Sequence, residues 1–248
     1  MSRSSKAPPS GTSGTSCEQG STFGVDASGV PEACCFPAKR GRPSVAEAEQ
    51  LSGKILDASW DVLLAEGFES FTFDRIARHA HIGKATIYSR FASKYDLLHA
   101  LLRRRIDMRR DFIMAQGAGL PLIEAFCLRA AEMLTLLSSP DGKLLERLID
   151  WLDEEKLAVG QPRVRDVAYR EAIDSISESF AQSNASGETR IADIRQAAEF
   201  WLEGLLGHAR RRDSQGEAPR AENEAWSRIY AHYFFAGIAA VSGSSAAG

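Results

Sequence analysis

The sequence predicts an all-α protein built from two helical modules. From about residue 44 onward, apolar residues recur at the three- and four-residue spacing that marks one face of a helix. No stretch combines alternating apolar and polar residues with the turn signals of β-hairpins. The 248 residues, 44% hydrophobic and 25% charged, are enough for one or two domains with a sizeable core.

The first 38 residues differ from the rest in composition. They are rich in Ser, Gly, Pro and Thr and lack apolar periodicity, so they bury too little to offset the entropy of ordering. We therefore expect residues 1–38 to be a disordered tail, and they contain no apolar core of a signal peptide. Residues 39–44 are basic and include Arg40 and Arg42, which suggests either a solvated linker or an arm that lies along an anionic partner.

The cysteines and the apolar runs indicate a cytoplasmic protein. Cys17, Cys34, Cys35 and Cys127 lack the spacing of a zinc site, and we interpret them as free thiols of a reducing compartment. The longest nearly apolar run, 233–241, is much shorter than the ~20 residues of a membrane span. We expect no membrane partner, no metal and no cofactor.

The first module begins with a helix over about 45–66, which Gly67 ends. Thr72 is suited to cap a second, short helix whose apolar residues form one stripe. A three-residue turn, 81–83, leads to a third helix over 84–90. A Ser93–Asp96 capping box then predicts a fourth helix, which reaches about Arg110.

Two short helices joined by a tight turn form a helix-turn-helix arrangement. The second helix of such a unit fits the major groove, where its side chains meet base edges and phosphates. Lys94, at the start of the next helix, combines its charge with the helix N-terminal field and is suited to hold a phosphate. Residues 39–115 carry a net positive charge and residues 116–248 a net negative charge, which favours an anionic partner for the first module. The helix expected over 84–90 is the second one of this unit, and its expected exposed residues are Lys84, Thr86, Tyr88, Ser89 and Arg90.

The stretch "ILDASWDVLLAEGFESFTFDRIARHAHIGKATIYSRFASKYDLL", residues 55–98, resembles the DNA-binding domain of the TetR family of bacterial transcriptional regulators. The resemblance covers roughly residues 45–105 and rests on many positions in register, among them Gly67-Phe68, Thr72, Thr86-Ile87-Tyr88 and Lys94. It implies a three-helix helix-turn-helix domain over 45–93. A connecting helix, 94–119, would follow, and then a C-terminal ligand-binding and dimerisation domain, 120–241.

The resemblance also assigns roles to individual residues. It implies that Thr72, Tyr88 and Lys94 contact phosphates. The turn usually has Gly where this chain has His81, and the third helix usually begins with Ser or Thr where it has Gly83. Gly83 stays in the expected DNA-binding set, but it lacks the hydroxyl that would donate to a phosphate. The residues implied to lie toward the bases are Lys84, Ala85, Thr86 and Ser89.

The basic arm also has a DNA-binding interpretation. Arg40-Gly41-Arg42-Pro43 resembles the core of an AT-hook, which lays arginines into the narrow minor groove of A·T-rich DNA. Basic N-terminal arms accompany other helix-turn-helix modules. We therefore include Arg40 and Arg42 among the expected DNA contacts.

The second module is predicted to contain five helices, near 121–137, 141–158, 162–183, 189–212 and 221–240. Ordinary core is the simplest interpretation of its large apolar side chains. The resemblance adds an apolar cavity for a small apolar or amphipathic ligand, and a homodimer formed by the last two helices. The residues expected to line that cavity are Phe126, Met133, Trp151, Tyr169, Ile173, Phe200 and Trp201.

The most favoured function is that of a ligand-responsive homodimeric repressor that binds a palindromic operator in double-stranded DNA and is associated with the nucleoid. One alternative is an architectural protein that prefers A·T-rich DNA and has no inducer. A helical enzyme is a remote alternative, because we find no paired acid and base, nucleophile motif or phosphate loop. The acidic run Asp153-Glu154-Glu155 is interpreted as a solvated helix face.

Overall fold

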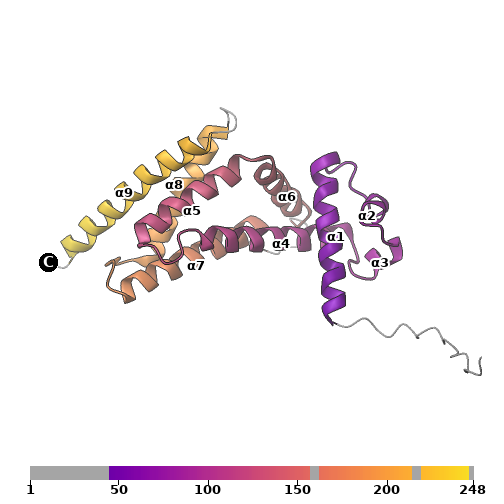
Figure 1. The fold of residues 1–248 in the computed structure, drawn as a ribbon, viewed down its shortest axis with the longest axis horizontal. Coiled ribbons are helices and arrows are strands. Elements are labelled where there is room, and N and C mark those ends of the chain that lie inside the picture. Colours follow the sequence, from indigo (N-terminus) through magenta and orange to yellow (C-terminus); the bar gives the residue numbers. More distant parts are fainter. Residues whose placement is uncertain (1–44, 157–161, 214–218, 246–248) are drawn as a thin grey trace, which may run out of the picture. The chain divides into compact units, whose positions relative to one another are not determined.

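The computed structural model describes residues 45–156, 162–213 and 219–245, and within these ranges it contains nine α-helices and no strand (Figure 1). The predicted all-α fold is confirmed for this part of the chain. The expected tail, 1–38, and basic arm, 39–44, lie outside the described residues. The helices are α1 Val45–Glu66, α2 Phe73–Ala80, α3 Lys84–Tyr88, α4 Lys94–Ala115, α5 Leu122–Ser138, α6 Pro140–Lys156, α7 Val164–Ala185, α8 Ile194–Asp213 and α9 Arg220–Ser245.

Local sequence signals explain the ends of the first helices. Gly67 follows α1 with φ +75°, and its N–H donates to the Leu63 carbonyl at 3.0 Å. The Thr72 hydroxyl accepts a hydrogen bond from the Arg75 N–H and caps α2. The Ser93 hydroxyl accepts from the Asp96 N–H at 3.1 Å and caps α4. Helix α3 ends at Tyr88, two residues earlier than predicted, and α4 continues five residues beyond Arg110.

A first hydrophobic core joins α1, α2, α3, α4 and α6. Leu98 of α4 and Leu148 of α6 are completely buried in it. The Trp60 indole of α1 donates to the Asp141 carboxylate of α6 at 2.8 Å. Helix α6 therefore packs as part of the core of the first three helices, although the sequence assigned it to the second module.

Helix α4 belongs to two packing regions. Its first half buries Leu97, Leu98 and Leu101 in the first core, and its second half runs on toward α5 and α7 (Figure 1). A continuous helix transmits a displacement of one end to the other. The fourth helix is thus physically placed to connect the two regions, as the sequence suggested.

A second core is formed by α5, α7, α8 and α9 and is dominated by aromatic rings. The Phe126 ring lies 5.0 Å from both the Phe180 and the Trp201 ring, measured between centroids, and Phe235 contacts all three. Helices α5 and α9 lie side by side, as do α7 and α8. Large rings contribute much buried area each, which suits the meeting point of four helices.

Two predictions about the second module of the sequence, residues 120–241, were wrong. The helix expected over 189–212 begins only at Ile194, because Asp193 accepts a hydrogen bond from the Gln196 N–H and caps it. Asp153, expected to be solvated, is buried and accepts hydrogen bonds from the N–H groups of Val164 and Arg165. It satisfies the first turn of α7 from the neighbouring helix α6.

Candidate functional site

The turn between α2 and α3 sets the orientation of the second helix of the pair. His81 adopts a left-handed conformation, with φ 54° and ψ 48°. The next N–H, of Ile82, donates to the Ala77 carbonyl at 3.0 Å, as in a helix-ending Schellman arrangement. His81 is the one non-glycine residue with positive φ among those described. Histidine tolerates a positive φ better than most residues but less well than glycine, and it occupies the position where the TetR resemblance leads one to expect glycine.

Helix α3 is held by one buried side chain and presents the rest of its surface outward. Ile87 is completely buried, whereas Tyr88 keeps 53% of its surface exposed. The Tyr88 ring packs on Phe73 of α2, with ring centroids 4.7 Å apart. Its hydroxyl makes no hydrogen bond to a residue in the described ranges. The ring is thus fixed by packing, and the hydroxyl is available to an external acceptor.

Lys84, at the first position of α3, is paired rather than free. Its ammonium group lies 2.9 Å from a carboxylate oxygen of Asp74 in α2, with both side chains about half exposed. The hydrogen bond from Lys84 to Asp74 raises the pKa of Lys84. The sequence interpretation missed this pair, because Asp74 lies ten positions before Lys84 in the chain. Contact of Lys84 with a base requires that it leave Asp74.

The hydroxyls of the predicted site differ in availability. Thr72 accepts the capping hydrogen bond described above, which leaves its own proton free to donate outward. The Ser89 hydroxyl donates to the Thr86 carbonyl at 2.8 Å, so its proton is already used. Gly83 caps α3 in an extended conformation without a side-chain bond, and Thr86 is half-buried beside it.

The remaining predicted DNA contacts lie at the edges of this face. Ala85 is exposed, and Arg90 is half-buried just after α3. Lys94 is half-buried, with its ammonium group 5.6 Å from the Phe71 ring and 5.4 Å from the Trp151 ring, measured to the centroids. The ammonium also lies 3.5 Å from the Phe68 carbonyl oxygen, so in this conformation it faces inward. Arg40 and Arg42 lie outside the described residues.

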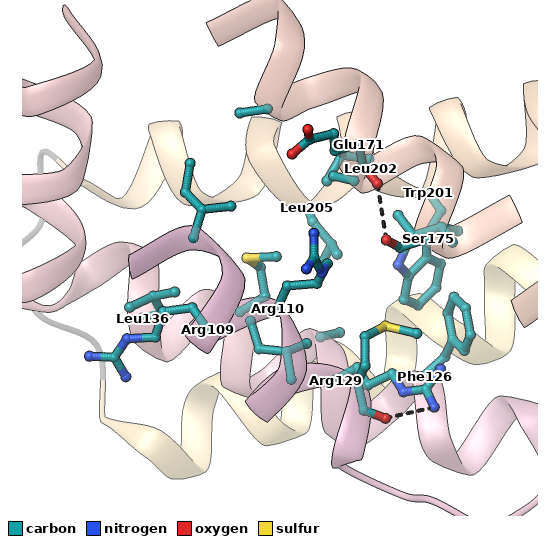
Figure 2. A pocket seen from close by; sticks show the side chains of 18 of the residues that line it. Arg109, Arg110, Phe126, Arg129, Leu136, Glu171, Ser175, Trp201, Leu202 and Leu205 are labelled. Atoms are coloured by element: carbon teal, nitrogen blue, oxygen red, sulfur yellow. Dashed lines mark hydrogen bonds between the residues drawn. The ribbon is translucent and has the colours of Figure 1, made fainter. Parts of the chain in front are cut away.

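A cavity of about 210 Å³ lies among α4, α5, α6, α7 and α8 (Figure 2). Three of the seven residues expected to line a cavity do so, namely Phe126, Met133 and Trp201. Most of the remaining wall is aliphatic. The second half of α4 supplies part of it through Ile106, Arg109, Arg110, Ile113 and Met114.

The other four expected lining residues lie elsewhere. Trp151 of α6 packs against the first core and does not line the cavity. Ile173 is completely buried in the second core, and Tyr169 packs against the same core, both outside the cavity wall. Phe200 keeps 62% of its surface exposed. Sequence periodicity identified these side chains as large and apolar, but it does not distinguish a core position from a cavity wall.

The cavity wall also carries charged residues that the sequence interpretation did not select. Arg109 pairs with Asp141, and Arg110 pairs with Asp107 at 3.0 Å. Glu171 pairs with Arg103. Arg129 differs from these, because no carboxylate in the described ranges pairs with it. Its guanidinium lies over the Phe126 ring, 5.5 Å from the centroid (Figure 2).

Neither a metal site nor a membrane-spanning helix is found among the described residues. No three His, Cys, Asp or Glu side chains come together as a possible metal site in these ranges. None of the described helices is long and apolar enough to cross a membrane.

Comparison with known proteins identifies relatives of the first module. Residues 55–101 match the family described as bacterial regulatory proteins, tetR family. The HTH-type transcriptional regulator SrpR of Pseudomonas putida is 30% identical over 119 residues, which are 47% of this chain and 54% of that protein. The DNA-binding transcriptional repressor TetR of Mycobacteroides abscessus is 38% identical over 58 residues, 23% of this chain and 30% of that protein. The match to SrpR thus spans about half of that relative's length.

Comparison of structures extends the likeness of fold beyond the first module. A solved TetR-family regulator from Mesorhizobium loti MAFF303099 superposes with a TM-score of 0.64 and 19% identity. The superposition covers 76% of this chain and 96% of that one, so it includes the later helices as well as the helix-turn-helix. Residues 55–101, with the left-handed turn between α2 and α3, are thus similar to the DNA-binding domain of the TetR family of bacterial transcriptional regulators, and the chain shares the fold of a solved protein described as a member of that family.

Proposed function

We propose that this chain is a homodimeric, ligand-responsive repressor that binds a palindromic operator through α3. The observation that carries the proposal is the exposed face of α3, where Tyr88 is fixed by Phe73 and keeps its hydroxyl free. A rigid ring with a free hydroxyl is suited to donate to a phosphate and so to fix the register of a helix in the major groove. Lys84, Ala85 and Thr86 then lie nearest the base edges.

Exposed apolar side chains on the last two helices support a dimer. Phe200 on α8 is 62% exposed, and Ile229 and Tyr233 on α9 are 59% and 78% exposed. Exposed large apolar side chains of this kind are suited to a protein–protein interface. In a two-fold dimer formed by α8 and α9, two copies of α3 would meet half-sites about one helical turn, or ~34 Å, apart.

The cavity supports the ligand-responsive part of the proposal. The second half of α4 lines it, while the first half of α4 is buried in the core that holds α1, α2 and α3. A ligand that favours one position of α4 would change the spacing of the two recognition helices. It would weaken operator binding only by its difference in affinity for the two states.

The functional assignment of the regions follows the sequence prediction. Residues 45–93 would bind DNA, 94–119 would connect, and 120–241 would bind ligand and dimerise. Arg40 and Arg42 would add minor-groove contacts. The relative named as a transcriptional repressor, from Mycobacteroides abscessus, supports repression rather than activation. A cytoplasmic location at the nucleoid is part of the same proposal.

Selection of bound fragments from random and genomic DNA at about 0.15 M salt tests the proposal, because phosphate contacts alone weaken strongly with salt. The full chain is compared with Tyr88→Ala and with a variant lacking residues 39–43. Recovery of one palindromic sequence, lost in Tyr88→Ala, is the expected result. Recovery of merely A·T-rich fragments, unaffected by Tyr88→Ala but lost on deletion of 39–43, would overturn it in favour of an architectural protein.

A further inference from the structure

Arg129 of α5 is the one charged residue on the cavity wall without an oppositely charged partner in the described ranges. Its Nε donates to the Gln116 carbonyl at 3.1 Å, and one terminal nitrogen donates to the Met114 carbonyl at 3.1 Å. The other terminal nitrogen lies 3.3 Å from the Ser179 hydroxyl. All three acceptors are neutral, so the positive charge of Arg129 is not compensated by a carboxylate.

These three bonds leave part of the guanidinium unused. A guanidinium has five N–H donors, and those bonds use one on Nε and one on each terminal nitrogen. One donor therefore remains on each terminal nitrogen. A carboxylate accepts two parallel hydrogen bonds of this kind, and such paired, charge-assisted bonds are among the strongest in proteins.

The surroundings of Arg129 make an anion more valuable there than at the surface. Burial lowers the pKa of Arg129, and no charged neighbour contributes to that change. The wall around it is mostly apolar and includes Phe126, Ile113 and Ile176. Arg129 is half-buried, so water screens its charge less than it screens a fully exposed one, and an ion pair formed there is correspondingly stronger.

The size of the cavity limits the rest of the ligand. At about 210 Å³ it exceeds the ~150 Å³ of an engineered cavity that holds benzene and is smaller than the ~300–1,000 Å³ of pockets for drug-sized molecules. Phe126 and Trp201 offer flat aromatic walls. A compact body of one or two fused rings therefore fits better than a long chain.

We propose that the cavity binds a small aromatic carboxylate, whose anionic group pairs with Arg129 and whose ring lies against Phe126 and Trp201. This inference rests on the proposed role of the cavity as a ligand site and adds the chemical class of the ligand. The same residue would couple the ligand to α4. This helix ends at Ala115, and Arg129 donates to the carbonyls on either side of it, those of Met114 and Gln116. A carboxylate that draws Arg129 toward the cavity weakens those bonds.

The test uses a matched pair of probes, 2-naphthoate and 2-naphthamide, which share one ring system and differ in charge. Binding to the full chain is measured by calorimetry for the wild type, Arg129→Gln and Arg129→Lys. Arg165→Gln serves as control, because Arg165 is paired with Glu146 and Asp150 and lies outside the cavity wall. Thermal unfolding of each variant checks that it is folded, and Arg129→Lys keeps the charge if Arg129→Gln does not fold.

We expect wild type to bind the carboxylate at least about tenfold tighter than the amide, since hydrogen bonds between charged partners are the stronger ones. The preference should disappear in Arg129→Gln, persist in reduced form in Arg129→Lys and remain unchanged in Arg165→Gln. Equal binding of both probes in wild type would overturn the anion inference and leave the cavity a ligand site. Binding of neither probe at millimolar concentration would overturn both.

Discussion

Two cations in this protein, Lys84 on α3 and Arg129 on α5, each have a proposed partner outside the chain, the base edges of DNA for Lys84 and a carboxylate for Arg129. Lys84 is about half exposed and already holds Asp74, whereas Arg129 lines a cavity and holds only neutral oxygens. An exposed ion pair contributes little to stability, so Lys84 can exchange Asp74 for a contact with DNA at small cost. A shielded cation without a carboxylate partner has much more to gain from an anion. For Lys84, the position on the exposed face of α3 indicates the proposed role. For the half-buried Arg129, the indication is the absence of a carboxylate partner in the described ranges.

The two regions that carry these cations are less separate than the sequence suggested. Helix α6 packs into the core of α1–α4, so the DNA-binding region depends on a helix that follows it by some fifty residues in the chain. The second half of α4 in turn lines the cavity.

The largest effect is expected from Leu148→Ala, which removes a completely buried side chain of α6 from the first core. The free energy of unfolding should fall by about 2–5 kcal/mol, the usual cost of such a truncation. Chemical denaturation measures it, and amide hydrogen exchange should show faster opening of α1. Leu128→Ala is the control, because Leu128 is 43% exposed. Unchanged exchange in α1 would contradict the shared core.

A smaller effect is expected from Asp153→Ala. The buried Asp153 carboxylate accepts hydrogen bonds from the first N–H groups of α7, and its loss leaves them unsatisfied. We expect about 1 kcal/mol of destabilisation, typical of a lost helix cap. Glu154→Ala, on the exposed neighbour, should change the unfolding free energy little. Equal effects of the two variants would argue against capping by Asp153.

These cases show which parts of the molecule sequence reasoning can reach. The caps at Thr72 and Ser93 and the end of α1 at Gly67 were predicted, because each depends on residues within a few positions. Asp193-x-x-Gln196 carries a capping signal of the same kind, which the interpretation overlooked.

Contacts between distant residues were not predictable in this way. Asp153 looked like one more exposed acid because the groups that bury it come from another helix. The same holds for the cavity wall. Arg129 lines it and the exposed Phe200 does not, and this difference depends on how the helices pack, which residue spacing does not reveal. The Lys84–Asp74 pair was missed as well, because the turn at His81 decides that these side chains meet.

A pH effect is expected from His208, which is buried and stacked on Trp226 with ring centroids 3.8 Å apart. Burial, followed by the nearby charges of Arg212 and Arg211, lowers the pKa of His208 below the ordinary 6.5. Below about pH 6.5, His208 therefore binds a proton more readily in the unfolded chain than in the folded one. The free energy of unfolding decreases as the pH is lowered from there, until the pH falls below the pKa of His208 in the folded chain.

Thermal unfolding at pH about 7.5 and about 5.5, on either side of the ordinary histidine pKa, measures this effect. The drop in Tm on acidification should be smaller in His208→Phe than in wild type. His232→Phe is the matched control, since His232 is exposed on α9. An identical drop in wild type and His208→Phe would show that His208 does not contribute.

The smallest effect is expected from Asp74→Asn, which releases Lys84 and removes a negative charge from the α2–α3 face. DNA affinity should rise a few-fold, in line with the ~0–1 kcal/mol of an exposed ion pair, and the gain should shrink at higher salt. Asp111→Asn, which changes an exposed charge on α4, should leave affinity nearly unchanged. Fluorescence anisotropy with the selected operator measures both, and equal responses would mean that net charge alone is responsible.

Helix α3 is proposed to meet the DNA, with Tyr88 on a phosphate and Lys84 near the bases. The most direct test is the affinity of Tyr88→Phe and Lys84→Ala for the selected operator and for its single-base variants, at one salt concentration. Tyr88→Phe should lower affinity by about tenfold on every sequence, as expected for one hydrogen bond to a charged group. Lys84→Ala should change the order of preference among the sequences. Unchanged affinity in Tyr88→Phe together with an unchanged order in Lys84→Ala would contradict the assignment of α3 as the DNA-reading helix.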